Sequence, residues 1–239
     1  MTQEQLKDLR IRLLNWCCFR HLNEKKQKPS LLGNILEELT EFVRAQDEHE
    51  QIDALCDIAV FYLNANPKQE IILGYAPAVF GNLRIVERVL SLIFLRTGTA
   101  ENVPNFCFNN IKSRGYDPYK CMDETIKEIE SRRGQYNNEI KKFIKDAGAY
   151  SLGELQKKFA NEPECSITDN GDSFVVRLGN AETSYVKWHK ADYSKCKLEK
   201  QPKKIYKGSF NAGLKDLRAI ASKERNTDGE RSSTIPTLE

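Results

Sequence analysis

Apolar residues near the start of the chain recur at spacings of three and four, the period of an amphipathic helix. Thr2 and Gln5 fit the two ends of a capping box, so a first helix is expected to begin there and to run to about Leu22. Its apolar face would contain Leu6, Leu9, Leu13 and Trp16. The polar run at 23–29 predicts a loop.

A second helix is predicted from a cap at Ser30 to about Gln46, followed by a tight turn at 47–49. The same periodicity then predicts a third helix that ends at 64–67. Because the connection is short, the second and third helices are expected to pack antiparallel.

Three further helices follow from the same pattern: 78–97 with Gly98 as a stop, 101–112, and 118–133. The last has Asp117 at its cap and Pro118 in its first turn, and Gly134 is its expected end. The pattern then changes, because 173–178 reads as a strand, 179–180 as a turn and 182–186 as the partner strand.

These elements predict three regions along the chain. The first is a helical core over 1–145, and the second is a small α+β appendage over 146–207 with a basic and aromatic segment. The third is a weakly structured tail over 208–239.

Composition narrows the class of protein. The 239 residues include 40% hydrophobic and 30% charged residues, which suits a folded domain. No apolar run reaches the roughly 20 residues of a membrane span, and the N-terminus lacks a secretory signal. We therefore expect a cytoplasmic protein with no membrane partner.

The seven cysteines are scattered without a CxxC pair, so zinc is not expected. A net charge of +3 gives no strong nucleic-acid footprint, so nucleic acid is not a required partner.

Acidic residues gather on the two helices that flank the turn at 47–49. Glu38 and Glu41 share one face of the first helix, with Glu37 one step to the side. The acids of the second helix fall at i, i+3 and i+7 and form one stripe: Glu50, Asp53 and Asp57. Antiparallel packing would bring Glu41 level with Glu50, and Glu38 level with Asp53.

Four to six acids in one small volume repel one another, and partial burial adds a desolvation cost. A hard divalent cation with oxygen ligands relieves both, which predicts Mg²⁺ or, alternatively, Mn²⁺. The plainer alternative is two solvated acidic faces. It is less favoured because few lysines stand at i+4 to pair with these acids.

The pattern Glu37-Glu38-x-x-Glu41 followed by Glu50-x-x-Asp53 resembles the signature of the all-α nucleoside triphosphate pyrophosphatases. Asp53-Ala-Leu-Cys-Asp57 is similar to their phage-type MazG-like members. The resemblance implies an all-α fold, a four-helix-type bundle, here with the small α+β appendage. It also implies a homo-oligomer, dimer or tetramer, that hydrolyses a nucleoside triphosphate to the monophosphate and diphosphate.

Under this hypothesis Glu38, Glu41 and Asp53 bind Mg²⁺ together with either Glu50 or Asp57, and Glu37 orients the attacking water. Glu37, Glu38 and Glu41 are thus the catalytic candidates. Both choices for the last metal ligand stay open.

A second group of residues is predicted to bind substrate. The resemblance implies triphosphate or base contacts from Lys127, Ser131, Arg132, Lys142 and Lys145. It extends to the segment 187–195, in which Trp188 and Lys190 become substrate candidates. Trp188 and Tyr193 could stack on a base or simply pack on the core. A plainer reading of 127–132 is a basic helix end that complements the helix dipole.

No GxxxxGK[ST] loop is present, so a P-loop NTPase is excluded. Two alternatives to a broad nucleotide pyrophosphatase remain. One is a base-specific dUTPase or dCTPase of the same fold. The other is a non-enzymatic helical protein that binds nucleic acid or another protein.

Overall fold

The computed structural model describes residues 1–74, 81–94, 102–140 and 142–199. Met1–Leu198 form one compact unit, and Glu199–Glu239 are assigned to a second. The predicted tail at 208–239, and the end of the predicted appendage, lie outside the described residues. None of the described helices is both long and apolar enough to cross a membrane.

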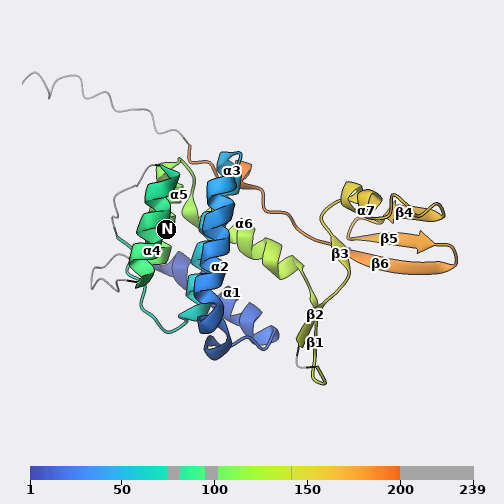
Figure 1. The fold of residues 1–239 in the computed structure, drawn as a ribbon, viewed down its shortest axis with the longest axis horizontal. Helices are drawn as coiled ribbons and strands as arrows, with labels where there is room; N and C mark the ends of the chain where they lie inside the picture. Colours follow the sequence, from blue (N-terminus) through green and yellow to red (C-terminus); the bar gives the residue numbers. More distant parts are fainter. Residues whose placement is uncertain (75–80, 95–101, 141, 200–239) are drawn as a thin grey trace, which may run out of the picture. The chain divides into compact units, whose positions relative to one another are not determined.

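Helices dominate the first part of the chain (Figure 1). Their bounds are α1 (Gln3–Phe19), α2 (Glu24–Arg44), α3 (Glu48–Ala65), α4 (Asn82–Phe94), α5 (Val103–Ser113) and α6 (Pro118–Ser131). The predicted helices over 101–112 and 118–133 are confirmed as α5 and α6. The helix predicted over 78–97 corresponds to α4, but both of its predicted ends, including Gly98, lie outside the described residues.

The expected all-α class is wrong. Of the residues that the structure describes, 57% are helical and 16% are in strands, which form two small sheets. One sheet is the hairpin of β1 (Gly134–Asn137) and β2 (Lys142–Lys145), which lies within the region assigned to a helical core. Gly134 begins this hairpin, and a Cβ at this position would lie 2.1 Å from the carbonyl oxygen of Ile144. Glycine is therefore required at this position by close strand packing.

The second sheet has the order β3–β6–β5–β4, with β3 parallel to β6 and the other pairs antiparallel. Its strands are β3 (Gly148–Ala149), β4 (Cys165–Asp169), β5 (Ser173–Leu178) and β6 (Ala181–Lys187), and helix α7 (Leu152–Lys158) lies between β3 and β4. The predicted strand pair at 173–186 is confirmed. We refer to residues 147–187 as the β-subdomain.

The predicted loop at 23–29 is also wrong, because α2 begins six residues before the expected cap at Ser30. Asn23 caps the helix by accepting the Lys26 N–H at 3.1 Å. Pro29 lies inside the helix, near its N-terminal end, where the missing proline N–H removes only one backbone bond. The capping box of α1 and the cap of α6 at Asp117 are confirmed.

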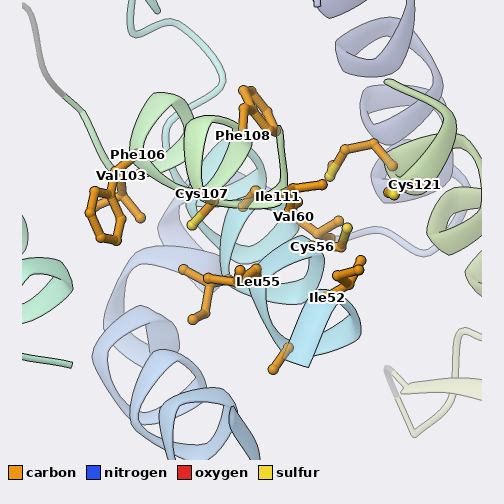
Figure 2. Packing of buried hydrophobic residues seen from close by; sticks show 14 of the residues in the cluster. Ile52, Leu55, Cys56, Val60, Val103, Phe106, Cys107, Phe108, Ile111 and Cys121 are labelled. Carbon is orange, nitrogen blue, oxygen red and sulfur yellow. The ribbon is translucent and has the colours of Figure 1, made fainter. Parts of the chain in front are cut away.

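Helix α3 is the centre of the main core, because its residues are buried against α1, α2, α5 and α6. Figure 2 shows Leu55, Cys56 and Val60 of α3 beside Ile111 of α5 and Cys121 of α6. Because α3 is buried on several sides, Asp53 and Asp57 are partly buried, whereas Glu48 and Glu50 at its start are exposed.

The β-subdomain has a small core of its own, formed by Ala149, Leu155, Phe174, Val176 and Tyr185. After β6 the chain returns to the helices through a 3-10 helix, η1 (Tyr193–Cys196), whose Tyr193 and Cys196 belong to the main core. The Asp117 N–H donates to the Cys196 carbonyl at 2.8 Å. The β-subdomain is therefore inserted between α6 with its hairpin and a segment that packs back on α6.

Candidate functional site

Three carboxylates from α2 and α3 lie close enough to raise one another's pKa. Burial raises the pKa of Glu38 to about 7, and the charges of Glu41 and Asp53 add to the effect. Burial also raises the pKa of Asp57 well above its ordinary value, with further contributions from Asp53 and Glu38. One oxygen of Glu38, Oε2, is buried without a hydrogen-bond partner. These acids are thus held at a site that disfavours their charged form.

Asp53 is the one member of this group with a direct hydrogen bond to a buried side chain. Burial raises its pKa, although the Tyr193 hydroxyl lowers it by donating to Oδ1 at 2.5 Å. The same hydroxyl lies 2.9 Å from the Thr125 Oγ1. Of the two roles left open for Tyr193, the structure favours packing in the core, because the residue is only 5% exposed.

A fourth acid, Glu128 of α6, was missed by the sequence analysis. Its charge raises the pKa of both Asp53 and Asp57. Its carboxylate accepts from the Tyr150 hydroxyl at 2.8 Å and from Arg132 Nη2 at 2.5 Å. Two features of the sequence could have indicated Glu128. It stands four residues before Arg132, and it lies on the same helix face as Cys121 and Thr125.

The remaining predicted acids lie at the edge of this group. Glu37 and Glu41 are exposed on α2, and both add to the raised pKa of Glu38. Glu50 instead makes a hydrogen bond at the start of α3, where its carboxylate accepts the Gln46 N–H at 2.6 Å. Of the two ligand sets left open, Asp53 with Asp57 is the pair that the structure brings to Glu38.

Arg132 lies near the acids, and two further cations, Lys145 and Arg20, lie near Arg132. Arg132 lowers the pKa of Asp53 and Asp57 by its charge, and its Nε is buried without a partner. Burial lowers the pKa of Lys145, and the charges of Arg132 and Arg20 lower it further. Arg20, which the sequence analysis missed, lies between the rings of Trp16 and Phe143, with its guanidinium 4.4 Å from each centroid. Like charges brought together in this way favour an anionic ligand.

Other predicted substrate residues lie elsewhere. Lys127 pairs with Asp123 at 2.8 Å and with Glu124 at 2.9 Å, away from the unpaired acids. The Ser131 hydroxyl donates to the Glu128 carbonyl and accepts the His189 N–H. Lys142 is exposed on β2. Trp188 and Lys190 line a separate cavity at the end of α6.

The donor atoms of the acidic group are all oxygens, which suits a hard cation such as Mg²⁺ better than zinc. The orphaned Glu38 Oε2 is an oxygen with the capacity to accept such an ion. Across the described ranges, however, no three His, Cys, Asp or Glu side chains are grouped as a ready metal site. Binding of an ion would therefore require rotation of the carboxylates toward one another.

The chain matches no protein-family model, no curated protein and no solved structure. The resemblance to the all-α pyrophosphatases therefore depends on the motif residues alone.

Proposed function

We propose that this protein is a Mg²⁺-dependent nucleoside triphosphate pyrophosphohydrolase, which converts a (d)NTP and water to the (d)NMP and diphosphate. The observation that carries the proposal is the group of partly buried acids on α2 and α3, with an orphaned Glu38 oxygen, directly beside Arg132. Burial of these acids is electrostatically unfavourable. They therefore do not stabilise the fold by themselves.

Glu38, Asp53 and Asp57 are the residues that would hold the cation, with Glu41 at the exposed edge. When bound, Mg²⁺ supplies positive charge to the phosphate oxygens and lowers the pKa of a coordinated water. Tyr193 keeps Asp53 oriented through its 2.5 Å hydrogen bond. Glu37, exposed one position before Glu38, is available to orient the attacking water.

The cations define the other half of the site. Arg132 is close enough both to Asp53 and to Lys145 for its charge to lower the pKa of each. A triphosphate bound with part of its charge on the metal side would meet Arg132 first and then Lys145. Guanidinium groups bind phosphate oxygens through paired N–H donors, which suits Arg132 and its free Nε.

Measuring diphosphate release from a panel of ribo- and deoxyribonucleoside triphosphates tests the proposal. Wild type is expected to turn over with Mg²⁺ and to lose activity in EDTA, and Asp53→Asn is expected to lower turnover by about 10²–10³-fold. A single active base would select the dUTPase or dCTPase alternative. Absence of turnover with every nucleotide, together with salt-sensitive binding to nucleic acid, would replace the enzyme by the binding-protein alternative.

The resemblance also implies a homo-oligomer. Light scattering of the full chain at several concentrations tests this part of the proposal separately.

A further inference from the structure

A cavity of about 660 Å³ opens at the C-terminal end of α6, against the β-subdomain. Its lining includes Ser131, Arg133, Tyr150, Asp172, Trp188 and Lys190. The volume lies within the range of small-molecule sites. Because Tyr150 and Asp172 come from the β-subdomain, the cavity exists only through the insertion.

Two aromatic rings form one side of the cavity. Tyr150 and Trp188 meet edge to face, with ring centroids 5.4 Å apart. The indole of Trp188 packs on Gly148 so tightly that a Cβ there would lie 2.2 Å from Nε1. Glycine at 148 thus allows the ring to occupy its position. Aromatic walls of this kind provide stacking surfaces for a flat ring.

Only some of the charged side chains that line the cavity have an ion-pair partner among the described residues. Lys187 pairs with Asp169 and His189 with Glu124, both at 2.9 Å. For Arg133 and Lys190, by contrast, no ion pair is found within the described part of the chain. A cavity with aromatic walls, and with two unpaired cations against one acid, Asp172, that likewise has no ion pair in the described ranges, favours a ligand that carries both a flat ring and negative charge.

Tyr150 joins this cavity to the charged site. Its ring contacts Trp188, while its hydroxyl donates to Glu128 at 2.8 Å and also contacts Arg132. Ser131 and Arg133, on either side of Arg132 in sequence, line the cavity as well. Arg132 does not line the cavity, but it contacts the Tyr150 hydroxyl and therefore lies next to the cavity wall.

We propose that this cavity binds the base and sugar of a nucleotide whose phosphates extend to Arg132. The proposal rests on the function proposed above, because it treats the ligand as the substrate itself. Trp188 and Tyr150 contact the base, and Arg133 and Lys190 supply positive charge at the phosphate end. The β-subdomain then determines which nucleotides the helical core can use.

Binding of nucleoside monophosphates without Mg²⁺, measured by calorimetry on the full chain, tests the cavity separately from catalysis. Trp188→Ala is expected to weaken binding about tenfold, the loss that corresponds to one stacked base. Lys190→Ala and Arg133→Ala change exposed residues and keep the test valid if Trp188→Ala fails to fold. Lys157→Ala, in α7 and outside the cavity, is the matched control and should bind as wild type. Equal affinity of wild type and all three cavity variants would overturn the proposal.

Kinetics distinguish the substrate from a second, regulatory nucleotide. A monophosphate that binds in the cavity should inhibit competitively, and Lys190→Ala should raise KM while leaving kcat near the wild-type value. Non-competitive inhibition would overturn the placement of the substrate base. Inorganic tripolyphosphate, which lacks a base, should bind wild type and Trp188→Ala alike. Monophosphate binding lost in the variants, but without turnover by wild type, would refute the proposed activity and leave the cavity as a nucleotide site.

Discussion

Helix α6 presents acids to two different environments, and they differ in how their charge is satisfied. On one side Asp123 and Glu130 pair with Arg12 of α1 at 2.6 and 2.8 Å, and Lys127 pairs with Asp123. Burial raises the pKa of Asp123, but hydrogen bonds from Lys127 and Arg12 outweigh burial and leave it below its ordinary value. We call Asp123 and Glu130 the outer acids.

On the other side, Glu128 pairs with Arg132 at 2.5 Å, and its charge raises the pKa of Asp53 and Asp57; we call Glu38, Asp53 and Asp57 the inner acids. Their burial is not offset by comparable pairing, so the pKa values of Glu38, Asp53 and Asp57 are raised. The outer acids are satisfied within the protein, as in a structural network. The negative charges of the inner acids are not compensated within the protein, which is typical of a functional site.

The largest expected effect is on activity. Glu38→Gln and Asp53→Asn should each lower kcat by about 10²–10³-fold, as for loss of one electrostatic contact to a transition state. The outer substitution Asp123→Asn should leave kcat near the wild-type value. Steady-state diphosphate release measures all three. Equal losses at inner and outer positions would remove the distinction between the two groups.

The next effect is on stability. Without Mg²⁺ at pH 7, Asp57→Asn should stabilise the protein by about 1–3 kcal/mol, because it removes the need to bury a poorly compensated charge. Urea unfolding measures the change, and addition of Mg²⁺ should stabilise wild type more than the variant. A less stable Asp57→Asn protein would mean that Asp57 is already satisfied within the fold.

The two groups should also respond oppositely to pH. Glu38 has a folded-state pKa of about 7 against an ordinary value of 4.5, so the folded state binds more protons between these values. Stability of the metal-free protein should therefore fall as pH rises from 4.5 to 7, by about 1–2 kcal/mol after allowance for solvent screening. Asp123 has a lowered pKa, so its contribution is lost only as pH falls below its ordinary value of 3.8. Unfolding of wild type and Glu38→Gln across this range measures the difference, and identical pH profiles would contradict it.

The smallest effect is expected from the outer network. Arg12→Ala should cost about 1 kcal/mol or less, because its partners are partly exposed and such pairs are weak. Thermal unfolding measures the loss, and diphosphate release should not change. A loss of activity would show that α1 positions α6 for the reaction.

Local signals predicted the helices well where a cap and a period agreed, as at Thr2 and Asp117. They failed at 23–29, where the polar run suggested a loop although Asn23 caps a helix that includes Pro29. The β1–β2 hairpin was missed because its strands have only four residues each, too few for an alternating pattern to be distinguished.

The sequence by itself determined that Glu38, Asp53 and Asp57 stand at helical spacings on neighbouring helices, because that spacing depends only on the period of the backbone. Only the tertiary structure decided which acids lack a partner. Glu50 turns back to its own helix start, Lys127 pairs with Asp123, and Glu128 and Tyr193 reach Asp53 from distant parts of the chain. Burial and pairing depend on which elements pack together, and no local pattern encodes that choice.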